Sequence, residues 1–532
     1  MFTRSRITRI TRFTAAALGI VAVMLPTAAA AWKPTSHVYF AEIAARDALD
    51  DGYVDITILA TGEVRRYRVE DRTRNALLYG RQQYRAGVLG PDAYPDILTG
   101  QQVIHPDPAD SGIADGSNAW LEHVWGGFEG DNWHHAFRLG FLTHAAGDMY
   151  GHTFINHFSG APFTLNPPDN AVRHIVLEGY IDKRLPAGEL TGDFFSANIL
   201  PVHERIYSTM IDARPGTALD GLLPRASSST NMSVPRLFST LRANLDADIR
   251  AYYDHKADLQ RRIANCAWTD WSCSNVALAA ELAAYVAANG LQTTYKERWR
   301  DDIDDGLRLW PQVSHEVAVA LFFNPERKAD TEKADQILTD YSTRHILSMA
   351  GLPTFVGLTI AVVGDIIDAI TPDWLLEPIR QMKAELLDML LKGATGMTKA
   401  ELKDYLTRPD RYFDQVMQTG NGEHITLQRF NREYLRISDP GFENPSESFD
   451  YRVLPATYNT VLASKLVLLP PEEINRLIRD LGGSRRLERP NVMLGFAHTL
   501  DGSAQWRSGM VLAADCNVYR KVFKPMPGDD CA

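Results

Sequence analysis

The segment GFLTHAAGDMYGH, residues 140–152, carries the most informative pattern in this 532-residue chain. It spaces His144, Asp148 and His152 four residues apart. On an α-helix each step of four residues turns the side chain by only about 40°, so these three side chains would share one face. Imidazole and carboxylate groups are ligands of zinc. The pattern predicts a helix at about residues 133–157, one face of which binds metal.

A second predicted helix, at about residues 170–184, repeats the spacing with His174 and Glu178. Taken alone, such a pair is also typical of an exposed helix surface. It gains weight here because it follows the first cluster so closely. Small residues within the first segment leave room for another backbone or a substrate to approach: Ala145, Ala146, Gly147 and Gly151.

Loop residues supply the other candidate ligands. Residues 90–132 are rich in Gly, Pro and Asp and are predicted to form long loops, which are usually functional in a compact domain. They include Asp92, in the sequence GPDAYPD, and His105, in the sequence IHPD. An Asp beside Gly or Pro is more often a turn residue, so its assignment depends on the whole set of ligands. His123 is an alternative to His105, and His157 is an alternative to His152.

The first 31 residues have the layout of a secretory signal peptide. Four arginines precede an apolar run, residues 15–25, that is short for a membrane span, and Ala29-Ala30-Ala31 offers a cleavage site. An uncleaved N-terminal anchor is the alternative. Cleavage after Ala31 would make Trp32 the first residue of a secreted or periplasmic protein. The loss of four arginines would then change the formal charge from −11 to −15.

The acidic charge bears on the partners of the protein. Its overall field does not attract phosphate groups, so nucleic acid is not a favoured partner. If the protein acts on phosphates, a local cation must bind them, and metal ions are the obvious candidates.

The ordered set of candidate ligands resembles the zinc-dependent phospholipase C family and the related S1/P1 nucleases. These families use an N-terminal Trp, a nearby His, and then Asp, His, His-x-x-x-Asp, His and His-x-x-x-Glu or Asp. This chain has the same order over about residues 32–180: Trp32, His37, Asp92, His105, His144, Asp148, His152, His174 and Glu178. The resemblance also explains the predicted cleavage point, since the free amine of the N-terminal Trp binds metal in these families.

The resemblance implies up to three zinc ions and two catalytic carboxylates, Asp92 and Asp148. The first ion would be bound by Asp92, His105, His144 and Asp148. The second would be bound by His152, His174 and Glu178. The third would be bound by the amino group and carbonyl of Trp32, by His37 and by the bridging Asp148. Such a cluster suits phosphodiester hydrolysis, because it supplies a hydroxide nucleophile and neutralises charge on phosphoryl oxygens.

Two spacings refine the expected substrate. Asp148 and His152 are four residues apart, whereas bacterial phospholipase C and the nucleases usually have six. The shorter spacing resembles the branch that contains glycosylphosphatidylinositol-specific phospholipase D. The five-residue step from Trp32 to His37 is closer to the nuclease pattern. We therefore expect a phospholipase of C or D type that hydrolyses head-group phosphodiesters and contacts a membrane surface transiently.

Two alternatives stay open at this point. A secreted nuclease should offer stacking aromatics and a basic track, and the sequence has Trp120, Trp125 and Trp133 but no basic cluster beside them. A metal-stabilised binding protein that has lost activity is the non-enzymatic alternative. Neither the oligomeric state nor the lipid head group can be inferred.

The periodicities predict a mainly α-helical fold. The resemblance implies that residues 32–225 form a phospholipase C/P1 nuclease-like catalytic domain. The periodicities also predict a helix at residues 36–50 and a short strand pair within 52–69. A Ser-rich linker, 226–233, leads to residues 235–532, a mostly helical region with minor β-structure that is packed on the first domain or completes it.

The four cysteines fit an oxidising compartment. Local pairing, 266–273 and 516–531, is favoured among the three pairings that four cysteines allow, and no pair has the C-x-x-C spacing of a zinc or redox site. Residues 346–364 carry no charge. They are interpreted as a buried helical hairpin, with a lipid-interface surface and a membrane span as alternatives.

Overall fold

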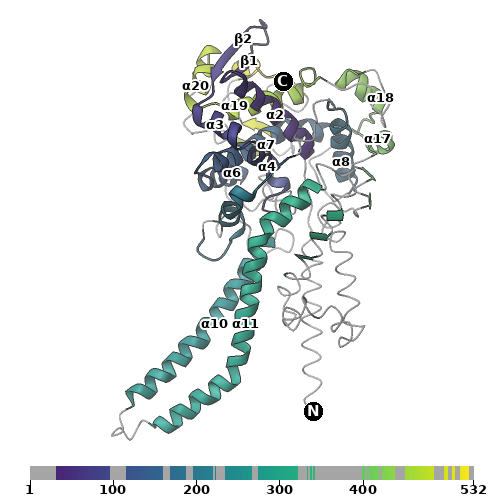
Figure 1. The fold of residues 1–532 in the computed structure, drawn as a ribbon. Coiled ribbons are helices and arrows are strands. Elements are labelled where there is room, and N and C mark those ends of the chain that lie inside the picture. The colour runs from purple at the N-terminus through teal and green to yellow at the C-terminus, as the bar shows by residue number, and fades with distance from the viewer. Residues whose placement is uncertain are drawn as a thin grey trace.

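The computed structural model is mainly α-helical, as predicted. Figure 1 shows a helical body from which a long helical hairpin extends. The structure describes residues 32–95, 116–159, 168–186, 196–217, 234–266, 274–320, 408–418, 422–437, 450–484, 497–500, 506–509 and 516–526, together with single positions between 219 and 222, 332 and 345, and 398 and 405.

The N-terminal elements follow the predicted order. Helix α2 (Pro34–Asp50) starts with a proline in its first turn, where the missing N–H costs nothing. It leads into an antiparallel hairpin of β1 (Tyr53–Thr57) and β2 (Val64–Arg68). Two short helices and a 3-10 turn follow: α3 (Asp71–Tyr79), α4 (Arg81–Val88) and η1 (Gly90–Asp92). The predicted helix and strand pair are thus confirmed.

Helix α7 (Asn132–Ser159) forms the centre of the core. A helix that is buried around its whole circumference must be covered on every side, and α7 is packed against α4, α3, α8 (Pro168–Asp182) and α19 (Pro455–Val467). Its approach to α4 is especially close. A Cβ atom placed on Gly140 would lie 2.1 Å from the carbonyl oxygen of Tyr84. Both predicted ligand helices, α7 and α8, are confirmed to within two residues at each end.

The prediction of long loops throughout residues 90–132 was wrong. The structure places helix α6 (Gly116–Gly127) within this segment. Trp120, Val124 and Phe128 recur at steps of four residues and are fully buried. Their burial outweighs the low helix propensity of the surrounding Gly, Asp and Ser residues. Residues 96–115, which include His105, lie outside the described residues.

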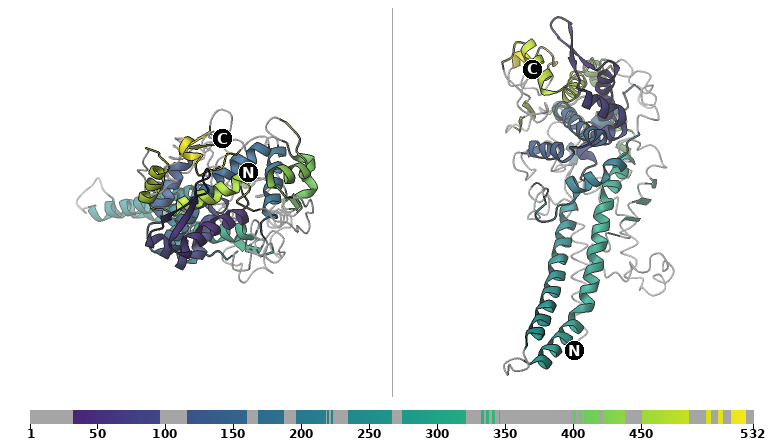
Figure 2. Two further views of the ribbon diagram at one scale, coloured as in Figure 1. Left: turned by 90° about the horizontal axis from the view of Figure 1, so that it is seen from above. Right: turned by 60° about the vertical axis from the view of Figure 1, so that its left-hand side comes forward.

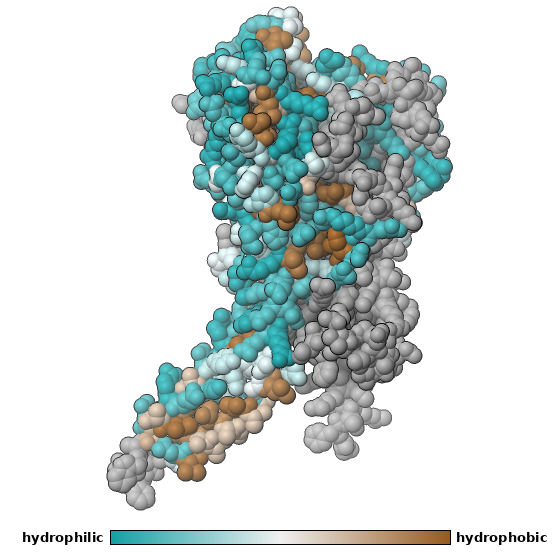
Figure 3. Space-filling view, viewed as in Figure 1, coloured by the Kyte–Doolittle hydropathy of each residue, from teal (hydrophilic) through white to brown (hydrophobic). Residues whose placement is uncertain are grey.

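Two long helices form the projecting hairpin, α10 (Val234–Asn265) and α11 (Asn275–Ala318). They are packed against each other and extend away from the body in each view (Figures 1 and 2). Apolar side chains are exposed on the distal part of the hairpin, with Val276 at 81% and Leu291 at 67% (Figure 3). Among the described residues, no helix has the length and apolar character that a membrane crossing requires.

Shorter elements complete the body, and a single hydrophobic cluster runs through it from Trp32 to Met526. These elements are η5 (Leu200–Val202), α9 (His203–Ile206), η6 (Tyr207–Ile211), α17 (Asp410–Val416), α18 (Leu427–Phe430), η10 (Asn431–Leu435), α20 (Pro471–Asp480), β3 (Ala497–Leu500), β4 (Trp506–Gly509) and α21 (Cys516–Tyr519).

Several sequence predictions are not tested by these elements. The division into two domains stays a prediction. Residues 1–31, the linker 226–233 and the uncharged segment 346–364 lie outside the described residues. Cys266 and Cys516 are disulfide-bonded, but Cys273 and Cys531 also lie outside the described residues, so the pairing stays a prediction.

A buried ion cluster joins α2 to α4. The carboxylate of Glu42, which is 2% exposed, accepts hydrogen bonds from Arg81 Nε and Arg85 Nε, each at 2.8 Å. Burial alone raises the pKa of Glu42, but the two guanidinium groups outweigh it and hold the pKa below its ordinary value. The cluster therefore stabilises the fold at pH values above the pKa that Glu42 has in the unfolded chain. This contribution is lost as the pH falls through the lower pKa that Glu42 has in the folded protein.

We expect Glu42→Gln to lower the free energy of unfolding by about 3 kcal/mol at neutral pH, because it removes one partner of a buried ion pair. Urea denaturation followed by circular dichroism measures this loss. The difference from the unchanged protein should shrink below about pH 4, where the carboxylate becomes protonated in the unfolded chain. Glu63→Gln, in an exposed pair with Arg65, is the matched control and should change stability little. Equal losses in both variants would contradict the role given to burial.

Candidate metal centre

Seven of the predicted ligands carry an imidazole or carboxylate that is buried in the core, and each of these residues is no more than 3% exposed. They come from four elements, α2, η1, α7 and α8: His37, Asp92, His144, Asp148, His152, His174 and Glu178. The spacing of four residues on α7 does place its three predicted ligands along one side of the helix, since His144 and His152 both approach Asp148. Polar groups are rarely buried this deeply unless they are paired or bind metal.

Asp148 lies where three imidazole rings converge. Its Oδ2 is 2.9 Å from His144 Nε2, and its Oδ1 is 3.1 Å from His37 Nε2. His152 Nε2 is farther, 4.0 Å from Oδ1. The two oxygens of one carboxylate therefore face imidazoles from two different helices, α2 and α7.

His144 is oriented by the backbone of the preceding elements. Its Nδ1 lies 2.8 Å from the carbonyl oxygen of Val88, which can only accept, so Nδ1 carries the proton. In the neutral ring this leaves the lone pair on Nε2, the nitrogen that faces Asp148. Such a hydrogen bond on the far side of the ring is usual for a metal-binding histidine. Gly90 makes this approach feasible, because at its φ of 51° a Cβ atom would lie 2.5 Å from His144 Cγ.

His37 reaches the same point through a gap in α7. A Cβ atom on Gly147 would lie 2.7 Å from His37 Nδ1, so the glycine makes room for the ring. The rings of His37 and His144 stack with centroids 4.0 Å apart. At Gly147 the room is therefore taken by a side chain, whereas the sequence predicted the approach of another backbone or a substrate.

His37, His144 and Asp148 form a group that could hold a metal ion, with ligand atoms all within 4.8 Å of one another. Within the described residues, no second group of His, Cys, Asp or Glu meets this criterion. The group combines ligands that the family resemblance divides between two ions.

Asp92 and Glu178 add negative charge to the surroundings of this group. Burial lowers the pKa of His144, but the carboxylates of Asp148 and Asp92 raise it to about 9. Burial also raises the pKa of Glu178 well above its ordinary value, and Asp92 and Asp148 raise it further. Each of these carboxylates is thus close enough to disfavour the charge on another. A bound cation would relieve this repulsion.

The ligands of α8 are held against the end of α7. His174 Nε2 lies 2.7 Å from Ser159 Oγ, so the nitrogen that remains for a metal is Nδ1. Glu178 follows one turn later on the same side of α8. At the other end of α8, Asp182 accepts a hydrogen bond from Ser36 Oγ at 3.0 Å and lies 4.0 Å from Lys33 Nζ. The start of α2 is thereby fixed to α8, beside the ligand His37.

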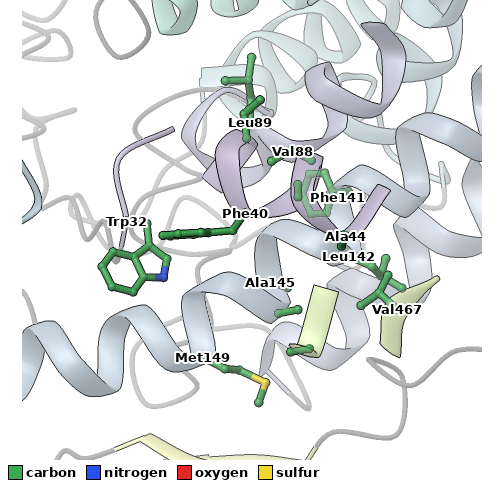
Figure 4. Close-up of a cluster of buried hydrophobic side chains, with 14 of the residues drawn as sticks. Trp32, Phe40, Ala44, Val88, Leu89, Phe141, Leu142, Ala145, Met149 and Val467 are labelled. Atoms are coloured by element: carbon green, nitrogen blue, oxygen red, sulfur yellow. The ribbon is translucent and has the colours of Figure 1, made fainter. Parts of the chain in front are cut away.

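Trp32 is fully buried at the start of the described chain. Its ring lies against Phe40, with centroids 5.6 Å apart, and next to α7 (Figure 4). The indole Nε1 donates a hydrogen bond to Thr460 Oγ1 at 3.2 Å. The side chain therefore anchors the residue that precedes α2, and metal binding by its amino group stays a prediction.

The two alternative histidines have other environments. His123 Nε2 lies 2.6 Å from the carbonyl oxygen of Thr209, and His157 is half-buried against Phe158. Neither belongs to the group around Asp148. Sequence reasoning missed the supporting contacts of Val88, Gly90 and Ser159. Only Gly90, in the sequence GPD before Asp92, carried a signal of its own, since Gly beside Pro indicates a tight turn.

Comparisons of the chain with protein-family models, with curated proteins and with solved structures found no match. The functional argument therefore rests on the ordered ligand pattern and on the geometry around Asp148.

Proposed function

We propose that the protein is a secreted, zinc-dependent phosphodiesterase, and specifically a phospholipase of C or D type that hydrolyses the head-group phosphodiesters of phospholipids. The observation that carries this proposal is the Asp148 carboxylate, which directs its two oxygens at imidazoles of α2 and α7. A carboxylate in this position suits a bridge between two metal ions. Transient contact with a membrane surface would bring the lipid to the site.

The ligand types and spacings fit zinc. Two ligand atoms of a tetrahedral zinc ion, each about 2.0–2.1 Å from the metal, lie about 3.3 Å apart. The separations of 2.9 Å and 3.1 Å between Asp148 oxygens and imidazole nitrogens are slightly shorter. A small outward shift would therefore admit an ion between each oxygen and its imidazole. Up to three ions are proposed, the others involving Asp92, His152, His174, Glu178 and the N-terminal Trp32.

The proposed reaction assigns a role to each part of the site. When bound, paired zinc ions activate water near neutral pH and neutralise charge on the phosphoryl oxygens. Asp148 and Asp92 would hold the ions through their carboxylates, with Asp148 shared between two of them. Val88 and Ser159 would orient His144 and His174 through hydrogen bonds. The surrounding apolar core would exclude bulk water and so strengthen these interactions.

The substrate class can be tested directly on the secreted, zinc-loaded protein. We expect hydrolysis of phosphatidylcholine or phosphatidylinositol vesicles, abolished by a chelator and restored by zinc, because the nucleophile depends on the metal. Phosphate-containing products separate the two types, since C-type cleavage releases the phosphorylated head group and D-type cleavage leaves phosphate on the lipid. Faster hydrolysis of single-stranded DNA would favour the nuclease alternative. Tight zinc binding without hydrolysis would favour a binding protein.

Replacing the bridging carboxylate should have the largest effect. Asp148→Asn keeps the shape but removes the charge between the imidazoles, so bound zinc should fall by more than one ion per chain and activity should nearly vanish. Mass spectrometry of metals in the purified protein measures the loss. Asp131→Asn, an exposed residue just before α7, is the matched control and should retain its zinc. Full zinc content in Asp148→Asn would rule out the bridging role.

The amino terminus offers an independent test. We expect the secreted chain to begin at Trp32, because its predicted cleavage site coincides with the Trp of the family pattern. Intact-mass measurement of secreted protein identifies the first residue. A version extended by one alanine before Trp32 should bind one zinc ion fewer, since it displaces the amine. Unchanged zinc content in the extended protein would remove the third ion from the proposal.

A further inference from the structure

Asn156 continues the ligand row of α7 by one more step. It follows His152 by four residues and Asp148 by eight, so it lies on the same side of the helix. Its side chain is buried, with 6% exposed. Neither the amide nitrogen nor the amide oxygen has a hydrogen-bond partner among the described residues. A buried amide with no partner is costly, which indicates that a ligand completes it.

The contacts of the neighbouring turn show which way Asn156 faces. Ser159, three residues later on α7, touches His174 of α8, so this side of α7 faces α8. The two helices run antiparallel. Ser159 of α7 meets His174 in the first half of α8. Farther back on α7, Asp148 meets the start of α2 through His37, and the last residue of α8, Asp182, meets it through Ser36. Asn156 lies one turn before Ser159 on α7, and Glu178 lies one turn after His174 on α8, so the antiparallel helices bring these two residues to the same level. One carboxylate oxygen of Glu178 also lacks a hydrogen-bond partner among the described residues.

We propose that Asn156 binds the phosphoryl group of the substrate, donating a hydrogen bond from its amide nitrogen to a phosphoryl oxygen beside His152 and Glu178. This inference rests on the proposed function and adds to it a residue outside the set of metal ligands. A neutral amide is a poor zinc ligand compared with imidazole and carboxylate, so hydrogen bonding is its stronger role. It also suits this position, because the same row of α7 already carries the carboxylate of Asp148. A carboxylate there would repel phosphate, and a lysine would compete with the metal.

A buried asparagine with a purely structural role has its amide group hydrogen-bonded within the chain, and Asn459 of α19 is an example. Asn459 of α19 is also fully buried, but its amide nitrogen donates to the carbonyl oxygen of Lys524 at 2.9 Å, and its oxygen accepts from Lys524 N–H at 2.8 Å. Its polar atoms are satisfied within the chain. Asn459 is therefore the matched control for Asn156, since it is the same residue type, is also buried, and lies in a helix that packs on α7.

The test compares zinc-loaded wild-type protein with Asn156→Ala, Asn156→Asp and Asn459→Ala. Titration calorimetry measures the affinity for inorganic phosphate, metal analysis gives zinc per chain, and thermal melting reports folding. We expect Asn156→Ala to keep its zinc and to bind phosphate about tenfold more weakly, because a hydrogen bond to an anionic oxygen is lost. Asn156→Asp, which keeps the shape, should bind phosphate more weakly still. Asn459→Ala should melt earlier and bind phosphate as the wild type does.

Three results would overturn the inference. They are wild-type phosphate affinity in both Asn156 variants, loss of zinc from Asn156→Ala, and an equal loss of phosphate affinity in Asn459→Ala. Failure of the proposed function is a separate result. Wild-type protein that binds zinc and phosphate but hydrolyses no phospholipid would contradict the lipase proposal, while the assignment of Asn156 would stand on the phosphate affinities.

Discussion

The structure depends above all on the burial of the Asp148 carboxylate inside the core. An isolated carboxylate cannot be moved from water to an apolar interior without a large cost, so the fold must supply partners for it. The fold supplies imidazoles from α2 and α7, at 3.1 Å and 2.9 Å. Carboxylates of η1 and α8 lie near enough to raise the cost further. A bound cation would stabilise a core that gathers like charges in this way, and folding would then be linked to metal binding.

Small residues allow the helices to meet around this carboxylate. Gly140 admits α4, Gly147 admits the ring of His37, and Gly90 admits the ring of His144. Larger residues at these positions would overlap backbone atoms or the atoms of the candidate ligands. The same glycines therefore determine both the shape of the site and the packing of the core. This explains why α7 carries both the ligands and the glycines in a single segment. The same turns of α7 therefore supply the candidate metal ligands and the close contacts with neighbouring elements.

The sequence was sufficient for the parts that depend on local periodicity. The spacing of His144, Asp148 and His152 predicted a helix and a shared face, and the structure has both. It was insufficient where tertiary burial decides, as in α6, whose apolar stripe lies among Gly, Ser and Asp residues. It also could not show that His37 joins His144 and Asp148 in one compact group. That arrangement depends on how α2 crosses α7, which no local pattern encodes.

The same dependence on long-range packing explains how the C-terminal part of the chain takes part in the site. Helix α19 packs against both α2 and α7, and its Thr460 accepts the hydrogen bond of the Trp32 indole. The methyl group of Thr460 also faces Gly147, on the side of α7 where His37 enters. The position of the N-terminal ligands is therefore set by a segment more than 400 residues later in the chain. The candidate metal centre, whose proposed ligands all precede residue 180, is thus supported by packing from residues 455–467.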